Sequence, residues 1–419
     1  MKARPNQKRW RTALASVLLL LLLNIVLPSF AALWVQTTSL PNGYYGHSLV
    51  YWSGYLYQAG GLSDNNGVAD GINVFYAQVH SNGTIGSWNS ATSLPDAVFD
   101  HASVAANGFV YVLGGGHYTE ANGFFYSNVV YYSKINSDGS LGMWNIANPL
   151  PQNLFFLSAL VWSNTIYVAG GYDGGLTLFS NVYSAQIQSN GSLSSWTPQT
   201  SLPIATDAQA GTVNGYFYEL GGFDNSGNVI SNAYYTKINA DGTLAGWNQA
   251  VPLPQPESNF GAIAVNGFVF SIGGNNGRNA TSSFYVAAVN GNGSLGSWAS
   301  GTSLPLPIYT FAVANNNSYI FLTGGEDNNG NPQSAVYSMA LPAPPVVPTL
   351  VARSFTNGNF QVQLASSTNI GFGLLASPDL INWTNLGWGF TDTNGTLSFT
   401  DTNAASFPNR FYRAYWPLP

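Results

Sequence analysis

The chain has 419 residues, of which 7% are charged and 14% aromatic, with 46 glycines and no cysteine. The lack of cysteine excludes disulfides, thiolate metal sites and thiol nucleophiles, and the aromatic content excludes a disordered chain. Beyond residue 31, six basic residues stand against seventeen acidic ones. Such a surface repels nucleic acid and anionic membranes, so we expect neither as a partner.

The first 31 residues have the order of a secretory signal peptide. Five of the first eleven residues are basic, and the apolar run 13–27 follows them. Pro28 then precedes Ser29-Phe30-Ala31, which places small residues at −3 and −1 of a cut after Ala31. An uncleaved anchor is the alternative, because 13–35 is long enough to span a bilayer, but Asn24 interrupts that span. We expect cleavage, and hence a secreted, periplasmic or cell-surface protein.

A repeat fills residues 33–341. A Trp followed six positions later by Leu-Pro occurs six times, at Trp34, Trp88, Trp144, Trp196, Trp247 and Trp298. A glycine doublet follows each Leu-Pro pair, at Gly60-Gly61, Gly114-Gly115, Gly170-Gly171, Gly221-Gly222, Gly273-Gly274 and Gly324-Gly325. Repeats of about 50 residues with these marks are typical of β-propellers.

Each repeat contains four expected strands, the number in one propeller blade. In the second repeat, Asn107-Gly108 separates two apolar runs and predicts a two-residue hairpin turn, because both residue types tolerate positive φ. Trp34 starts a fourth strand without the first three, and the last repeat, 304–341, lacks a Trp. We therefore expect residues 33–39 to pair beside Ala335–Met339 and to close a ring of six blades, which removes an exposed edge.

This pattern resembles the kelch family over residues 33–341. The matching features are the glycine doublets, the strands before them, such as Tyr167-Val168-Ala169, and the Tyr and Trp that follow. The kelch pattern sets Tyr and Trp close together, whereas here the aromatic residue lies thirteen positions before the Trp, as at Tyr131 and Trp144. The resemblance implies an all-β, six-bladed kelch-type propeller over residues 32–341, with packing roles for the glycines and tryptophans.

A second unit follows the repeats. Residues 342–348 are rich in proline and predict a stiff linker. Residues 349–419 alternate short apolar and polar runs and contain Ser377-Pro-Asp-Leu-Ile-Asn-Trp383 and Arg410-Phe-Tyr-Arg413. They resemble small β-sandwich-like modules appended to exported bacterial proteins. A passive spacer or surface-retention role is favoured over ligand binding.

Candidate ligand-binding residues lie where each repeat enters its first strand. Near a propeller's central channel, the sequence places polar and aromatic residues at Tyr45, Asp100, Asp207, Asn259 and Tyr309. Such a ring suits sugars, because hydrogen bonds hold hydroxyls and aromatic rings cover apolar faces. Ordinary loop chemistry explains the same residues equally well. Arg278, on a loop after a doublet, is a further candidate that would hold a carboxylate.

Catalytic candidates are few. His47 and His101 share a repeat position that is apolar elsewhere, which favours packing over chemistry. Glu219 lies within an apolar strand, as either a hydrogen-bonded core residue or a tuned acid, and Glu257 is a further available carboxylate. The Asp-x-x-Gly loops, such as Asp224–Gly227, predict type I turns rather than calcium sites. We expect no metal and no cofactor.

Two functions follow. The first is an exported, non-catalytic, monomeric propeller that binds a glycan or an extracellular protein on the face carrying the strand-entry residues. The alternative is a sugar-active enzyme similar to kelch-type sialic acid mutarotases, which would draw on Glu219, Glu257, His47 or His101, and Arg278. The resemblance implies the fold of that family but no particular activity, and binding is favoured because no catalytic motif joins these residues.

Overall fold

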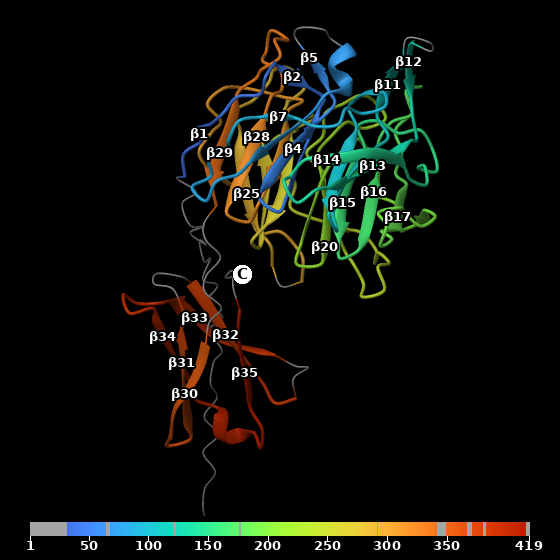
Figure 1. The fold of residues 1–419 in the computed structure, drawn as a ribbon. Helices are drawn as coiled ribbons and strands as arrows, with labels where there is room; N and C mark the ends of the chain where they lie inside the picture. Colours follow the sequence, from blue (N-terminus) through green and yellow to red (C-terminus); the bar gives the residue numbers. More distant parts are fainter. Residues whose placement is uncertain are drawn as a thin grey trace, which may run out of the picture.

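The computed structural model describes residues 32–63, 68–119, 123–175, 177–290, 292–341, 349–366, 371–379 and 383–415. The expected signal peptide, the expected linker and the turn at Asp64 lie outside these residues. The described residues form antiparallel strands and two short 3-10 helices, η1 (Val68–Ile72) and η2 (Ala404–Ser406), so the chain is all-β (Figure 1). None of their helices has the length and apolarity that crossing a membrane requires.

The repeat region, residues 32–341, contains six four-stranded sheets in its described part. The first strand of each sheet is innermost, and the sheets are, in chain order, β3 (Ser48–Trp52), β4 (Tyr55–Ala59), β6 (Val74–Gln78) and β7 (Asn89–Ser90); β9 (Ala102–Ala106), β10 (Phe109–Leu113), β13 (Val130–Ile135) and β14 (Leu141–Ile146); β15 (Ser158–Trp162), β16 (Thr165–Ala169), β17 (Val182–Gln186) and β18 (Thr197–Pro198); β19 (Gln209–Val213), β20 (Tyr216–Leu220), β21 (Ala233–Lys237) and β22 (Asn248–Gln249); β23 (Gly261–Val265), β24 (Phe268–Ile272), β25 (Phe284–Ala288) and β26 (Ala299–Ser300); β27 (Ala312–Asn315), β28 (Tyr319–Thr323), β29 (Val336–Ala340) and β1 (Val35–Gln36).

The sixth sheet joins the two ends of the repeat region. β1 pairs antiparallel with β29, with Val35 opposite Ser338. The innermost strands contact one another in chain order, and β27 contacts β3. Trp34 packs with Phe284 and Met339 in one buried apolar cluster between the fifth and sixth sheets. The pairing expected for the N-terminal strand is therefore present.

The repeated Trp residues hold each sheet to the one before it. Each indole N–H donates to a backbone carbonyl four residues after the preceding Trp: Trp88 to Thr38, Trp144 to Thr92, Trp196 to Asn148, Trp247 to Thr200 and Trp298 to Val251. Trp34 donates to Thr302, 3.1 Å away, so the series returns to its start. These contacts explain why the Trp recurs at a fixed place in each repeat, and they give the six residues structural roles.

The glycine doublets make a second set of contacts between repeats. Gly60 has φ +62°, and a Cβ there would lie 2.4 Å from the carbonyl oxygen of Val98. The next residue, Gly61, donates its N–H to the same oxygen. The last doublet repeats this contact with the first repeat, because the Gly325 N–H donates to the carbonyl of Tyr44. Glycine is required at these places by both the positive φ and the close approach of the neighbouring backbone.

Short extra strands lie at one end of the repeat region. In the first repeat, β2 (Tyr44–Tyr45) pairs with β5 (Leu62–Ser63), which follows β4. In the second repeat, β8 (Ala97–Phe99), β11 (Gly116–Thr119) and β12 (Gly123–Tyr126) form a three-stranded sheet. Figure 1 shows β11 and β12 at the same end as β2 and β5. The Asn-Gly turns lie at strand ends as expected, with Asn107 at φ +53°.

The C-terminal module, residues 349–419, is built from two three-stranded sheets. Their orders are β30-β31-β34 and β33-β32-β35, with the bounds Thr349–Thr356, Asn359–Ala365, Thr396–Asp401, Thr384–Phe390, Gly371–Ser377 and Phe411–Tyr415 respectively. Val362, Leu364, Phe372, Leu374 and Phe399 form a buried core from both sheets. The two sheets therefore share one apolar core.

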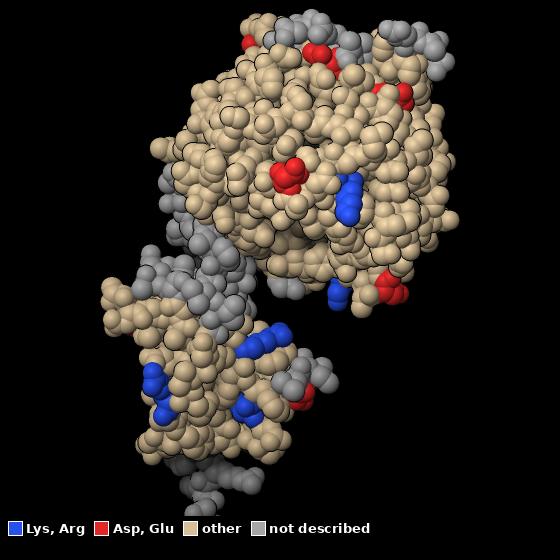
Figure 2. Space-filling view, viewed as in Figure 1, with Lys and Arg blue, Asp and Glu red and all other residues tan. Residues whose placement is uncertain are grey.

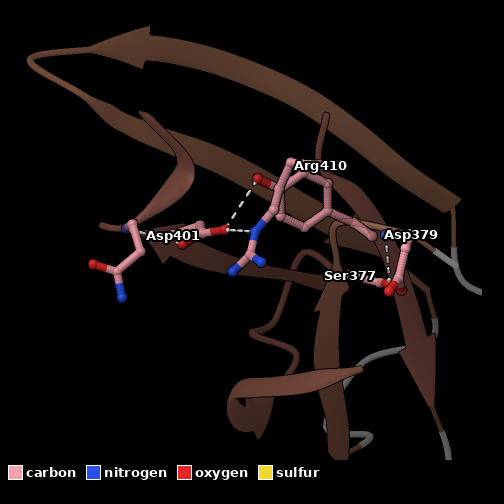
Figure 3. Close-up of polar contacts among 6 residues, drawn as sticks. Ser377, Asp379, Asp401 and Arg410 are labelled. Atoms are coloured by element: carbon pink, nitrogen blue, oxygen red, sulfur yellow. Dashed lines mark hydrogen bonds and ion pairs between the residues drawn. The ribbon is translucent and has the colours of Figure 1, made fainter. Parts of the chain in front are cut away.

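Residues of the two segments noted in the sequence of this module, 377–383 and 410–413, make several contacts within it. Asp401 is 1% exposed, and its Oδ2 accepts hydrogen bonds from Arg410 at 2.7 Å and from the Tyr412 hydroxyl at 3.2 Å (Figure 3). The Ser377 hydroxyl is 3.0 Å from an Asp379 carboxylate oxygen. The Arg413 guanidinium lies 4.1 Å from the centre of the Trp383 ring. The two segments therefore supply contacts that stabilise the module.

Candidate functional site

Residues before each innermost strand form an inner rim around the centre of the repeat region. The Asp100 N–H donates to the Gly46 carbonyl at 2.7 Å, and the Gly46 N–H donates to the Thr310 carbonyl at 3.0 Å. Phe156 donates in the same way to Asp100, and Thr310 to Asn259. All five residues have φ between +50° and +60°. The shared backbone shape brings the same position of five repeats together.

A cavity of about 230 Å³ lies inside this rim. Its wall comes from the innermost strands of all six sheets and is made largely of small side chains, among them Ser48, Ala102, Ser103, Ser158, Ala159, Ala210 and Ala262. The small side chains of these strands leave space at the centre. The rim residues Gly46, Asp100, Phe156, Asn259 and Thr310 also line the cavity.

Two carboxyl groups approach each other at the rim beside Gly46. Asp100 Oδ1 lies 2.5 Å from the position that a Gly46 Cβ would occupy. Glu326 Oε2 accepts a hydrogen bond from the Thr310 hydroxyl at 3.2 Å, on the other side of Gly46. Burial and the Glu326 charge raise the pKa of Asp100 to about 7, and burial raises the pKa of Glu326. Glycine at position 46 is what leaves space for the Asp100 carboxyl.

Two tyrosines complete this part of the rim. Tyr45 is half-buried, and burial together with Glu326 and Asp100 raises its pKa. Tyr309 pairs with Glu326 through a β-bridge, and burial and Glu326 raise its pKa too. We call Tyr45, Asp100, Tyr309, Thr310 and Glu326 the rim cluster. It offers aromatic rings, hydroxyls and two carboxyls, and no lysine or arginine lines the adjoining cavity among the described residues.

Of the other expected binding residues, Asn259 adjoins this cluster, because its carbonyl accepts the Thr310 N–H, whereas Asp207 and Arg278 lie apart from it. Asp207 has an ordinary φ, is not among the cavity-lining residues, and accepts a hydrogen bond from the Phe223 N–H at 2.6 Å. Burial raises its pKa to about 6 despite that bond. Asn259 lines the cavity. Arg278 is exposed on the loop after the fifth doublet and does not line the cavity. The structure thus brings Tyr45, Asp100 and Tyr309 together and leaves Asp207 and Arg278 outside.

The two repeat histidines are buried in the wall. The His47 Nε2 lies 2.9 Å from the Thr323 hydroxyl, and the His101 Nε2 lies 2.8 Å from the Ser48 hydroxyl. Burial lowers the pKa of each to about 3, so both are neutral. His47 lies against Gly324 as Phe311 lies against Gly273 in the neighbouring repeat. This equivalence favours packing for both histidines.

The two candidate glutamates differ in their hydrogen bonding. Glu257 accepts hydrogen bonds from Ser271, Ser283 and Gln255, so both oxygens of its carboxylate have partners within the protein. Glu219 is 1% exposed, its Oε1 has no partner, and burial raises its pKa to about 8. The Ser158 hydroxyl lies 3.0 Å from Glu219 Oε2 and 2.8 Å from the Ala208 carbonyl, and it has only one proton to donate. Burial therefore favours the protonated, neutral form of Glu219 in the folded protein.

Sequence reasoning missed Glu326 and the role of Gly46. Glu326 follows the last glycine doublet, where the other repeats have Leu62, Gly116, Tyr172, Phe223 and Asn275. An acid at a repeat position that is mostly apolar elsewhere is the feature of the sequence that could have indicated Glu326 as a site residue. The described residues contain no group of three or more side chains suited to a metal ion. The Asp224 loop uses its carboxylate to accept the N–H groups of Ser226 and Asn228, as a turn does.

Comparison with known proteins bears on the fold. The chain is 25% identical over 415 residues to the kelch domain-containing protein SSO1033 of Saccharolobus solfataricus, covering 95% of this chain and 51% of that protein. It is 25% identical over 203 residues to kelch-like protein 35 of Mus musculus, covering 48% of this chain and 31% of that protein. The chain therefore spans about half and about a third of these relatives.

The solved structure of YjhT matches with a TM-score of 0.58 at 12% identity, covering 79% of this chain and 99% of that one. The comparisons support a kelch-repeat propeller. No family model matches the chain. The resemblance drawn from the glycine doublets is confirmed at the level of the repeat and the propeller fold, and these kelch-type relatives leave the chemistry of the rim cluster to be judged from its own residues.

Proposed function

We propose that the repeat region is a closed ring of six blades that binds a neutral glycan at the rim cluster. Ring closure is supported by the β1–β29 pairing and by the contacts of Trp34 with Thr302 and of Gly325 with Tyr44, which join the last repeats to the first. A rim whose backbone is fixed by hydrogen bonds presents its side chains in one arrangement, as a binding site requires.

The observation that carries the binding proposal is the rim cluster beside an open cavity. Tyrosine rings cover the apolar faces of a sugar, and carboxyls bind its hydroxyls. The pKa of Asp100, raised to about 7, lets this carboxyl donate as well as accept hydrogen bonds near neutral pH, and burial raises the pKa of Glu326 as well. Two acids with no nearby cation among the described lining residues disfavour an anionic sugar.

A titration with neutral sugars tests this function. Glycan-array screening of the mature protein, followed by calorimetry on a bound monosaccharide, should show that Tyr309→Ala weakens binding by about 1–2 kcal/mol through lost apolar contact. The control is Asp138→Ala in the exposed turn before Trp144, where the side chain accepts hydrogen bonds from the Ser140 N–H and hydroxyl. Equal loss of affinity in both variants contradicts the proposal. So does a glycan that binds only to the C-terminal module, or a protein that binds where no glycan does.

A sugar-active enzyme is the second candidate, similar to kelch-type sialic acid mutarotases. Glu219 favours it, because burial raises the pKa of this acid and its hydrogen bond with the cavity-lining Ser158 would connect it to a substrate. The absence of Arg278 from the lining weighs against an acidic substrate. Turnover of a free sugar that is lost in Glu219→Gln, with the fold intact, would support catalysis over binding.

Export completes the proposal. The basic and apolar order of residues 1–31 predicts removal by signal peptidase and a mature chain that starts at Ala32. The C-terminal module would then act as a spacer or surface-retention unit of an exported monomer. N-terminal sequencing of protein recovered outside the cytoplasm checks this, and a retained Met1 would indicate an anchor.

A further inference from the structure

The second repeat carries an extra hairpin at the end of the repeat region that holds the rim. Its strand β12 alternates its side chains, so that Phe124 and Tyr126 are 65% and 40% exposed. The residue between them, Phe125, lies against the buried His117, with ring centres 5.4 Å apart. One face of β12 thus anchors the hairpin and the other presents two aromatic rings to solvent.

A first row of rings runs from this hairpin to Asp100. Phe124 contacts Tyr118 of β11 edge to face at 5.2 Å between ring centres, and contacts Phe99 of β8 in the same way at 5.9 Å. Phe99 directly precedes the rim residue Asp100. Its ring lies over Gly116, where a Cβ would come within 2.4 Å of the ring. The row therefore ends at the residue that directly precedes Asp100 of the rim cluster.

A second row ends at the neighbouring rim residue. Tyr126 stacks on Phe155 with ring centres 4.5 Å apart, and Phe155 contacts Phe156 at 5.0 Å. Phe156 lines the central cavity, and its N–H donates to the Asp100 carbonyl at 2.8 Å. Gly174 of the third repeat leaves the space for Tyr126, because a Cβ there would lie 2.0 Å from that ring. The two rows thus converge on adjacent, hydrogen-bonded rim residues.

We propose that these rings form an aromatic platform, Phe99, Tyr118, Phe124, Tyr126, Phe155 and Phe156, which binds further sugar units of a neutral oligosaccharide whose end lies at the rim cluster. The inference rests on the proposed function and gives it a substrate class, a chain of sugars rather than a single one. Continuity with the rim carries it, because the same backbone segments supply both surfaces. No member of the platform is charged, so it matches a neutral ligand.

An apolar peptide is a less suitable occupant. The exposed rings of the platform, Phe124 and Tyr126, are each held from below by further rings, and no pocket for an apolar side chain is found among these residues in the described part of the chain. Flat rings with polar edges match sugars, which combine apolar faces with hydroxyls at their edges. The two carboxyls at the end of the platform supply hydrogen bonds to the terminal sugar.

Calorimetry with matched short and long ligands tests the platform. The probes are neutral β-linked glucose, mannose and xylose hexasaccharides, each compared with its monosaccharide on the full mature chain. Phe124→Ala should weaken hexasaccharide binding about tenfold and leave monosaccharide binding unchanged, since one solvent-exposed ring contact is lost. Phe124→Trp should retain the tighter binding. The matched control is Met143→Ala, which removes a side chain that is 79% exposed in the same repeat on outer strand β14.

Each result has a defined meaning. Selective loss of hexasaccharide affinity in Phe124→Ala supports the platform. If Tyr309→Ala weakens both ligands while Phe124→Ala changes neither, the platform is wrong and the proposed function stands. If Phe124→Ala weakens both ligands equally, or weakens binding of an apolar peptide instead, the platform does not act as an oligosaccharide surface. If the parent protein binds none of the probes, both proposals fail.

Discussion

Acidic groups have opposite surroundings in the C-terminal module and at the rim of the repeat region: one is paired with a cation and the others are not. In the module, the buried Asp401 is paired with Arg410 and Tyr412. At the rim, Asp100 and Glu326 approach each other with no cation beside them in the described lining, and their pKa values are raised. Paired charge stabilises a fold, whereas polar groups left for an outside partner weaken it and mark a site. Few charged side chains appear on the face of the repeat region in Figure 2. Carboxyl groups gathered at the rim are therefore unusual for this surface.

The largest expected effect is on the ring itself. Deleting residues 32–40 removes β1 and the Trp34 contacts, so β29 becomes an exposed strand edge. Exposed edges pair with other chains, and we expect the variant to aggregate. Size-exclusion chromatography with light scattering measures this. A monomeric variant with unchanged melting temperature would show that ring closure contributes little.

The next effect tests the paired acid. Arg410→Ala leaves the buried Asp401 without its cation and should destabilise the C-terminal module by about 3 kcal/mol. Urea unfolding followed by Trp fluorescence measures the loss. Arg353→Ala is the control, because that arginine is exposed and bonds only to Gln363, and its cost should stay within about 0.5 kcal/mol. Equal costs would contradict the stabilising role of the pair.

Glu219 predicts a pH dependence of stability. Its pKa rises from 4.5 in the unfolded chain to about 8 in the folded protein because it is buried. Between these values the folded state holds a proton that the unfolded state has lost, so stability falls as pH rises, by about 1.4 kcal/mol per pH unit. Glu219→Gln keeps a donor for Ser158 and should flatten this slope. An unchanged slope in urea unfolding between pH 5 and about pH 8 would contradict the burial argument.

The smallest effect concerns the rim pair. Glu326→Gln removes the charge that helps to raise the pKa of Asp100, so this pKa should fall toward its ordinary value while burial keeps it elevated. NMR titration of the Asp100 carboxyl measures the shift, and Asp327→Asn in the adjacent exposed turn should produce a smaller one. A pKa of Asp100 that is unchanged in Glu326→Gln would mean that the two carboxyls do not interact. The contrast between the rim acids and the cation-paired Asp401 would then fail.

Much of the fold was predictable because its signals are local and repeated. The step from Trp to Leu-Pro to glycine doublet predicted four-stranded sheets and the pairing of Val35–Gln36 with β29, as observed. The site was only partly predictable. Asp207 and Asp100 occupy the same repeat position, yet the fourth repeat is one residue shorter before its doublet, and Asp207 departs from the rim backbone to bond Phe223. One deleted residue changes the path of a loop without changing the strands around it.

By itself, the sequence determined the all-β class, the strand pattern and the places where glycine is required, because each depends on residues close together in the chain. Only the tertiary structure decided that Asp100 and Glu326, from the second and last repeats, both lie near Tyr45 of the first. It also decided that the hairpin of the second repeat extends aromatic rings to the same rim. The reason is physical: a ring brings distant repeats side by side, and the pKa values and contacts of their side chains depend on neighbours that no single repeat contains.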